Sequence, residues 1–565
     1  MGDSNGVAAQ AAERFAIGIS FGNSSSSIAR LTPEGKAEVI ANEEGDRQIP
    51  SVLSYIDGEE YHGTQAKAQL VRNSQNTVAY FRDFLGKNFK SIDPTACHQS
   101  AHPQQSDSTV AFSIRDTTSE TPNTVTVSDI TTRHLLRLKK SASDYLGKEV
   151  TAAVVTVPTD FTDAQREALT AAATAAGLEI LQLIHEPVAA VLAYDARPEA
   201  VVAEKLVVVA DLGGTRSDAA VIACRGGMYT ILATAHDYEL GGASLDQIII
   251  DHFAKEFIKK HKTDPRENAR GLAKLKLEGE ATRKALSLGT NASLSIESLA
   301  DGIDFSSTVN RTRYELLSGK VFAQFTRLIE QVVQKAELDV LDIDEVIFSG
   351  GTSHTPKIAQ LARNIFPEKT QILAPSTSTT AINPSELSAR GAAIQASLIQ
   401  EFEKEDIEQS IHPMVTATPH LHNAIGVEFA SGESVEFKPL LNAETALPAR
   451  RTAQFSAPKD GGDVIVRVCE GVRSIKVTKP EPKEKPAKTE DEDDSNFDSD
   501  EDEEEIREIV WKTEKPIAEL AVKGVKAGSK VELMIHVNAD LGLQVTAREV
   551  GRQSAVRGAV ESPKA

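Results

Sequence analysis

The sequence predicts an α/β domain over roughly the first 400 residues and a small antiparallel β-domain after it. Short β-rich runs alternate with helical patterns as far as Glu403, which is typical of parallel α/β units. Beyond that residue, apolar and polar side chains alternate, as they do in half-buried antiparallel strands. A chain of 565 residues is also too long for a single hydrophobic core. We therefore expect at least two domains.

Individual elements follow from local patterns. Strands of the first part are predicted at 153–158, 205–214 and 345–351, and each of them runs into glycine or proline. Thr162 and Gln165 form a capping box, so a helix should begin there and end at Gly177, where a left-handed backbone costs little. Strands of the second part are predicted at 463–468, 530–537 and 542–549.

A weak internal repeat links two glycine-containing hairpins. The segments "AIGISFGNS" and "VVADLGGTR" both read as a strand, a turn with glycine, and an outward strand that begins with Ser or Thr. Glycine turns expose backbone N–H groups with no Cβ in the way, and such concave turns suit phosphate oxygens. A single turn of this kind is usually only a turn. Two of them predict half-domains that face each other across a cleft.

Charge and composition narrow the class of protein. The net charge is −21, and the window 490–505 alone holds 12 acids and no base, which leaves −21 + 12 = −9 for the rest. We expect disorder at 1–13 and in the Pro/Lys-rich and acidic insert 479–507. No run is long enough to cross a bilayer, no basic patch indicates nucleic acid, and three scattered cysteines fit a reducing compartment. We expect a cytoplasmic protein without membrane or direct nucleic-acid contact.

Several segments in order resemble the 70-kilodalton heat-shock protein family of the DnaK type. They include "IGISFGNSSSS", "IHEPVAAVLAY", "VADLGGTRSDAAVI", "GEATRKALSLG" and "VIFSGGTSHTPKI". The resemblance implies an actin-like, two-lobed nucleotide-binding domain at 14–403, a linker at 404–416, a substrate-binding-type β-sandwich at 417–550 and a tail at 551–565. In this family a helical lid follows the β-domain, and we expect it to be missing here, because no helical pattern follows the β-domain.

The resemblance also implies which residues meet the phosphates of ATP. They are Gly22, Asn23, Ser24, Gly213, Gly214, Thr215, Arg216, Gly241 and Gly242, and the retained family acids are Glu186, Asp211 and Asp218. The family has an aspartate at Ser20 and a lysine at Arg82. A neutral serine cannot replace the charge that holds magnesium, and arginine places its donors differently from lysine. We expect ATP binding without significant hydrolysis, no catalytic residue and no certain metal site.

Arg216 stands where the family has a threonine. We expect it to offset phosphate charge that magnesium would otherwise carry, and the alternative is an arginine that faces solvent. On the adenosine side, the residues that match the family are Glu280, Arg283, Lys284, Ser287, Gly350, Gly351 and Thr352. His354 and Ser385 depart from it, which leaves their contacts with adenine open.

The linker that couples the two domains in this family also differs here. The linker "DIEQSIHPM" has only two isoleucines where ordinary members have leucines, so it should transmit nucleotide state weakly. Together the departures resemble the atypical Ssz-type branch, which pairs stably with a J-domain protein of the zuotin type. That pair, the fungal ribosome-associated complex, stimulates a separate ribosome-bound heat-shock chaperone. The resemblance therefore implies a cochaperone that reaches the ribosome through its partner, and leaves contact with nascent chains open.

Two alternatives remain at this point. One is an ordinary ATP-hydrolysing, peptide-binding foldase with a divergent active site. The other, more remote, is a sugar or glycerol kinase of the same actin-like fold, although such kinases lack this β-domain. The serine at position 20, the altered linker and the missing lid favour the cochaperone over both.

Overall fold

In the computed structural model the described residues are 14–97, 99–107, 109–197, 203–410, 421–431, 434–443, 445–478, 506–552 and 554–561. Internal contacts divide the chain into two units, Met1–Ile222 with Ile231–His412, and Ala223–Thr230 with Pro413–Ala565. The predicted lead-in 1–13, the last part of the linker and the insert at 479–505 lie outside the described residues.

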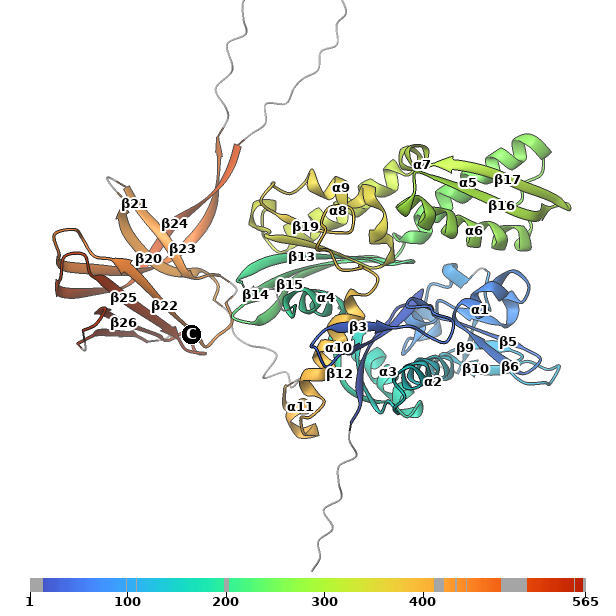
Figure 1. Ribbon diagram of the computed structural model, residues 1–565, viewed down its shortest axis with the longest axis horizontal. Helices are drawn as coiled ribbons and strands as arrows, with labels where there is room; N and C mark the ends of the chain where they lie inside the picture. The colour runs from blue at the N-terminus through green and yellow to red at the C-terminus, as the bar shows by residue number, and fades with distance from the viewer. Residues whose placement is uncertain are drawn as a thin grey trace, which may run out of the picture. The chain divides into compact units, whose positions relative to one another are not determined.

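The first unit contains two mixed sheets, each the centre of one lobe (Figure 1). The sheet of the first lobe has the order β12-β11-β1-β2-β3, with β4 also paired to β2. Its strands are β1 (Ala16–Phe21), β2 (Ser25–Leu31), β3 (Ala37–Ile40), β4 (Ile49–Pro50), β11 (Ala152–Val157) and β12 (Glu179–His185). β1, β11 and β12 run parallel, whereas β2 is antiparallel to β1. Apolar residues of this sheet share one core with helices α2 (Val127–Leu146) and α3 (Asp163–Ala175).

The sheet of the second lobe has the order β15-β14-β13-β18-β19. Its strands are β13 (Lys205–Leu212), β14 (Ser217–Arg225), β15 (Met228–Asp237), β18 (Glu345–Ser349) and β19 (Gln371–Leu373). β13, β18 and β19 run parallel. The three strands predicted for the first part are therefore confirmed as β11, β13 and β18. The predicted helix is confirmed as α3, with the Thr162–Gln165 capping box formed and Gly177 at φ 70°.

Helices α4 (Glu186–Asp195) and α10 (Leu387–Ile399) join the two sheets. α10 packs against β1 and β2, α4 contacts β13 and β18, and the two helices contact each other. The backbones approach closely in both places. A Cβ on Gly391 of α10 would lie 1.9 Å from the Ala189 carbonyl oxygen of α4, and a Cβ on Gly18 of β1 would lie 2.1 Å from the Ala393 nitrogen of α10. Because glycine has no Cβ, the backbones can pack this closely, and α4 and α10 together connect the sheets of the two lobes.

Smaller elements extend both lobes towards the end where α1 and α6 lie (Figure 1). In the first lobe they are β5 (Val52–Ile56), β6 (Glu59–His62), α1 (Gly63–Ala68), β7 (Thr77–Ala79), β8 (Pro103–Ser106), β9 (Thr109–Ile114) and β10 (Asn123–Thr126). In the second lobe they are α5 (Gly242–His261), α6 (Ala269–Leu288), β16 (Asn291–Ala300), β17 (Ile303–Asn310) and α7 (Arg311–Leu317). Helices α8 (Gly319–Lys335) and α9 (Pro356–Arg363) instead lie beside the second-lobe sheet (Figure 1), where α8 contacts β13 and α9 contacts β19. Residues 404–410, expected in a linker, form helix α11 (Lys404–Ser410), because Ile407 packs into the core beneath β12.

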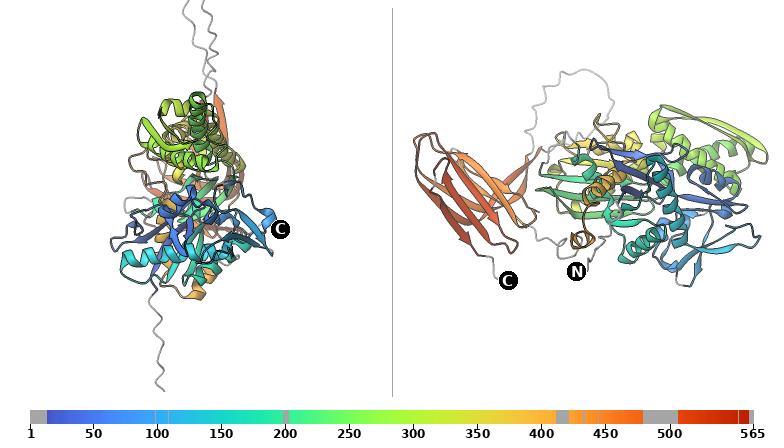
Figure 2. Two further views of the ribbon diagram at one scale, coloured as in Figure 1. Left: turned by 90° about the vertical axis from the view of Figure 1, so that its right-hand side faces the viewer. Right: turned by 60° about the horizontal axis from the view of Figure 1, so that its bottom comes forward.

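The second unit contains two four-stranded antiparallel sheets, whose orange and red strands appear in Figure 2. Their orders are β21-β20-β23-β24 and β22-β25-β26-β27. The strands are β20 (Ala424–Ser431), β21 (Ser434–Leu441), β22 (Ala449–Ser456), β23 (Gly462–Thr478), β24 (Ile506–Val525), β25 (Lys530–Val537), β26 (Leu543–Glu549) and β27 (Val556–Val560). Both sheets contribute to one apolar core, for example Val468 from the first and Leu533 from the second. The three strands predicted here are confirmed as parts of β23, β25 and β26.

Two stretches of this unit differ from expectation. Val556–Val560, expected in the tail, pairs with β26 as an edge strand. The predicted insert runs to residue 507, whereas β24 begins at Ile506. β23 and β24 stay paired from Gly462↔Val525 to Thr478↔Ile506, beyond the segment where β20 pairs with β23. Beyond the segment that pairs with β20, β23 and β24 therefore form a two-stranded ribbon that ends at the pair Thr478↔Ile506.

Candidate nucleotide site

The two glycine-containing hairpins meet between the lobes, as predicted. The β1–β2 turn carries Asn23, whose Nδ2 donates to the Thr215 Oγ1 in the β13–β14 turn at 3.2 Å. A Cβ on Gly214 would lie 2.4 Å from the Ser24 Oγ. The backbone N–H groups of Ser24, Gly214 and Thr215 have no hydrogen-bond partner within the described residues. These N–H groups are donors that an anion could use.

Gly241 and Gly242 hold the start of α5 against the second hairpin. The N–H of Gly242 donates to the Gly213 carbonyl at 3.0 Å, and the N–H of Ala243 donates to the Gly214 carbonyl at 2.8 Å. A Cβ on Gly241 would lie 2.7 Å from the Gly214 oxygen, so only glycine allows this approach. The Gly242 N–H, predicted to face phosphate, is used within the protein instead.

Arg216 is buried and bonded to carboxylates of both lobes. Its side chain donates from Nε to Asp218 Oδ2 at 2.8 Å and from Nη2 to Asp160 Oδ1 at 2.9 Å. Asp160 follows β11 in the first lobe, whereas Arg216 and Asp218 belong to the second. The guanidinium also lies over the Tyr238 ring, 4.7 Å from its centroid. The residue is 7% exposed, so the alternative of a solvent-facing arginine is wrong.

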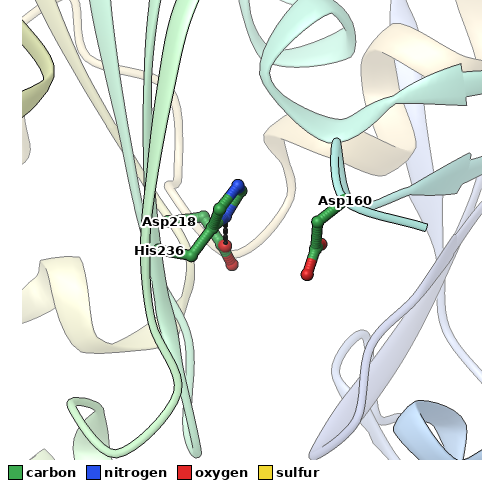
Figure 3. A group of neighbouring side chains, drawn as sticks. All are labelled: Asp160, Asp218 and His236. Carbon is green, nitrogen blue, oxygen red and sulfur yellow. Dashed lines mark hydrogen bonds and ion pairs between the residues drawn. The ribbon is translucent and has the colours of Figure 1, made fainter. Parts of the chain in front are cut away.

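Figure 3 shows Asp218 and His236 together on one side and Asp160 facing them from the other. These three residues are a donor set that could hold a cation. His236 Nδ1 lies 2.6 Å from Asp218 Oδ1, and Arg216 Nη2 bonds to both carboxylates. Burial raises the pKa of Asp160, but Arg216 and the Tyr238 hydroxyl at 2.8 Å outweigh it and lower that pKa to about 2. The guanidinium therefore takes the position of the cation.

Arg82 forms a second buried arginine centre. Its Nη1 lies 3.3 Å from Glu186 Oε1, its Nε lies 2.9 Å from Asp83 Oδ1, and it is 5% exposed. Burial raises the pKa of Glu186, and the carboxylates of Asp211 and Asp218 raise it further against the effect of Arg82. The side chain predicted to replace a water-positioning lysine is thus held by two acids.

The acids around the hairpins fit guanidinium groups better than magnesium. Ser20 lies half-buried at the end of β1, paired with Thr156, and offers only a hydroxyl. Of the retained acids, Glu186 is paired with Arg82 and Asp218 with Arg216. Burial and the neighbouring Asp218 raise the pKa of Asp211, the third acid. Magnesium at a nucleotide site is usually held by one or two carboxylates together with water and phosphate oxygens. Two of the three retained acids are already paired with arginines, so among them Asp211 is the carboxylate left to serve such an ion.

The predicted adenosine residues gather on α6 and its neighbours. Glu280 accepts from Lys67 of α1 at 2.6 Å and from Lys284 at 2.7 Å, so it also joins the two lobes. Burial raises the pKa of Glu280, but the two lysines lower it to about 2. Arg283 is buried and pairs with Asp246 of α5 at 2.6 Å. Ser287 donates to the Arg283 carbonyl at 3.1 Å, which leaves its Oγ lone pairs for a ligand.

The turn after β18 completes this region. Gly350 has φ 82°, and a Cβ there would lie 2.4 Å from the Leu212 oxygen. Gly351 begins the short helix that follows, and Thr352 Oγ1 donates to the Gly213 carbonyl at 2.8 Å. His354 and Ser385, the two departures from the family, bond to each other at 3.1 Å. The adenosine and phosphate parts are therefore connected through the backbone of the second hairpin.

Sequence reasoning missed the partners of the predicted residues. Asp160 and Tyr238 hold Arg216, Lys67 holds Glu280, and Asp246 holds Arg283. Asp160 lies directly after a predicted strand, at an edge where ligands of α/β sheets often bind, and this position was the one usable signal. Asp246 ends the segment "ELGGASLD", which belongs to the family resemblance but gave this residue no role, whereas Lys67 and Tyr238 lie outside the segments that carry the resemblance.

Comparisons with known proteins agree with this geometry. A family model described as Hsp70 protein matches residues 16–481. The chain is 45% identical to ribosome-associated complex subunit SSZ1 of Saccharomyces cerevisiae, over 96% of this chain and 99% of that protein. It is 44% identical to a heat shock protein 70 homolog of Schizosaccharomyces pombe, over 96% and 95% of the two chains. It is 33% identical to heat shock 70 kDa protein 14 of Xenopus tropicalis, over 80% and 87%.

One further observation concerns membranes. Among the described residues, none of the helices has both the length and the apolar character that a bilayer span requires. Together, the family match over most of the chain and the relatives of high coverage identify the family. The chain belongs to the Hsp70 protein family.

Proposed function

We propose that this protein is an ATP-binding, hydrolysis-deficient cochaperone that forms a stable heterodimer with a J-domain protein of the zuotin type. In this proposal the pair works in the cytoplasm at the ribosome, where it helps to stimulate a separate ribosome-bound chaperone. The similarity to a subunit of a ribosome-associated complex, over nearly the whole length of both chains, supports the assembly part of the proposal.

The observation that carries the loss of hydrolysis is the pair of buried arginines among the retained acids. Phosphoryl transfer needs magnesium charge on the phosphates and a positioned water. Here Arg216 is bonded to Asp160 and Asp218, and Arg82 to Glu186, so carboxylates that could act on metal or water are neutralised. Ser20 adds no charge. The site keeps hydrogen-bond donors for a nucleotide while it lacks the groups that would cleave one.

Nucleotide binding is supported by donors on two sides of the site. The free N–H groups of Ser24, Gly214 and Thr215 suit phosphate oxygens, and the polar group around Glu280 and Arg283 suits a ribose and a purine. Arg216 contributes positive charge near the hairpins, but its two carboxylate partners largely cancel that charge. We propose that ATP is a structural ligand here.

We assign the remaining organisation on the same basis. The actin-like nucleotide-binding domain at 14–403 is followed by a substrate-binding-type β-sandwich at 417–550. Ribosome contact passes through the J-domain partner, without direct binding of nucleic acid or membrane by this chain. We propose that the β-sandwich at 417–550 presents its surface to the J-domain partner. Contact with a nascent chain is not part of the proposal.

Two measurements on the full chain test the proposal. Isothermal titration should detect ATP binding, while a single-turnover assay with bound ATP should give no hydrolysis above the rate of free ATP. Size-exclusion chromatography with a J-domain protein of the zuotin type should give one stable one-to-one complex. A monomer whose ATP turnover rises when peptide is added would instead show an ordinary foldase, and absence of ATP binding would refute the proposed nucleotide role.

A further inference from the structure

A line of buried and partly buried hydrogen bonds runs through the first lobe to the first hairpin. His62 Nε2 lies 2.7 Å from His134 Nδ1, and His134 Nε2 lies 2.9 Å from Ser26 Oγ. Ser26 Oγ lies 3.0 Å from Ser51 Oγ, and Ser51 Oγ donates to the Gly22 carbonyl at 2.8 Å. The line starts at the end of β6, passes through α2 and β2, and ends in the turn between β1 and β2.

The direction of every bond in this line follows from its last acceptor. A carbonyl oxygen only accepts, so the single hydroxyl hydrogen of Ser51 is used on Gly22. Ser51 must then accept from Ser26, which leaves Ser26 to accept from His134 Nε2–H. A neutral His134 with its hydrogen on Nε2 accepts at Nδ1, so His62 Nε2–H donates to it. All four bonds therefore donate towards the hairpin.

The surroundings keep both imidazoles neutral, as this order requires. His134 is fully buried, with Phe21 and Phe81 at ring-centroid distances of 5.6 Å and 5.7 Å. Burial holds the pKa of His134 well below its usual value and lowers the pKa of His62 to about 4. Of the charged groups near His62, Arg137 lowers that pKa further and Glu43 opposes it.

Ser51 is the point where the line acts on the hairpin. Its hydroxyl bonds to the Gly22 carbonyl, and its backbone N–H donates to the Ser24 carbonyl at 3.1 Å. Two carbonyls of the same turn are thus fixed from one residue. In a trans peptide unit the N–H points opposite to the C=O, so these bonds orient the N–H groups of Asn23 and Ser25, which share peptide units with the two carbonyls. The peptide that carries the Ser24 N–H lies between these two fixed units.

We propose that His62, His134, Ser26 and Ser51 form a one-directional hydrogen-bond relay that positions the first hairpin for the phosphates of a nucleoside triphosphate. These four are positioning residues, since none of them is placed against the ligand itself. The inference rests on the proposed ATP binding and deepens it. It assigns to His134, which is buried, and His62, which is partly buried, a role in triphosphate affinity that the sequence did not suggest.

The test compares ATP with adenosine, which lacks the phosphates, as titrants of the full chain. Ser51→Ala should weaken ATP binding by about fivefold, the effect expected from losing one hydrogen bond, and leave adenosine binding unchanged. His134→Leu should act in the same direction, and His134→Gln, which keeps an N–H donor, should recover part of the loss. Because relay residues act through one another, Ser51→Ala with His134→Leu should cost less than the sum of the single effects.

Ser54→Ala is the matched control. Ser54 is equally buried and bonds to Thr77 Oγ1 at 2.8 Å, but this pair does not contact the hairpin. It should leave the affinity for both titrants unchanged. Equal loss of ATP and adenosine affinity in Ser51→Ala, or ATP affinity as in the unaltered protein, would overturn the relay. If the unaltered protein itself binds adenosine but not ATP, the proposed function fails and the relay with it.

Discussion

Arg216 Nη2 lies 2.9 Å from Asp160 Oδ1, so an ion pair joins the turn of the second hairpin to the end of β11 in the opposite lobe. The Tyr238 hydroxyl reaches the other oxygen of the same carboxylate at 2.8 Å. Both contacts come from the protein alone. The lobes are therefore held together at the phosphate end without any contribution from a nucleotide.

Replacing Arg216 should destabilise the first unit. Arg216→Thr leaves Asp160 and Asp218 close together without their cation, and the loss should be about 3 kcal/mol in the free energy of unfolding. The measurement is the midpoint of chemical unfolding. Arg266→Thr is the control, since Arg266 also pairs with two aspartates but is one-third exposed, and should cost less than about 1 kcal/mol. Equal losses in the two variants would show that the Arg216 pairs are worth no more than surface pairs.

Loss of the cross-lobe pair should also speed nucleotide release. The lobes must separate before a nucleotide leaves the space between them, and Asp160→Asn removes one charge that opposes separation. The dissociation rate of a fluorescent ATP analogue should rise by about fivefold, as expected for an ion pair of about 1 kcal/mol. Asp251→Asn breaks a pair within one lobe and should not alter the rate. A rate for Asp160→Asn equal to that of the unaltered protein would rule out the pair as a barrier.

Removal of magnesium should affect a Ser20 variant more than the unaltered protein. A carboxylate at this position, at the end of β1, would add the anionic oxygen that the site lacks. With Ser20→Asp, chelation by EDTA should lower ATP affinity by about tenfold, the effect of one lost charge-assisted contact. With the unaltered protein the change should be less than about twofold. Ser20→Asn, which has the same shape without the charge, should behave like the unaltered protein, and an equal EDTA response in all three would contradict the prediction.

The stability of the first unit should fall in mild acid because of His62. Its pKa in the folded state is about 4, below the value near 6.5 of an unfolded chain, so between these two pH values the unfolded state binds more protons. The free energy of unfolding should therefore decrease as pH falls from 6.5 to 4, by up to about 1.4 kcal/mol per pH unit from this residue. His62→Leu should show a shallower decrease in chemical unfolding across that range. Parallel pH curves for the two proteins would count against a lowered pKa.

Local signals allowed the strands, the capped helix and the meeting of the hairpins to be predicted. A strand pattern or a capping box is contained within a few residues. The two glycine-containing hairpins have similar sequences, which predicted that they occupy equivalent positions in the two half-domains. The Arg216–Asp160 bond spans 56 positions and the His62–His134 bond spans 72, and no local pattern records either pair. Tertiary packing likewise decides α11, where Ile407 reaches a core, and β27, which pairs with β26 along its edge.

The ribbon of β23 and β24 bears on how this protein can change over evolutionary time. Its last pair, Thr478↔Ile506, brings the two ends of the acidic insert to neighbouring strand positions. A segment whose ends already meet pays a closure entropy that grows only with the logarithm of its length, about 0.6 kcal/mol for each doubling. The insert can therefore lengthen, shorten or change its charge at little cost to the two sheets beneath.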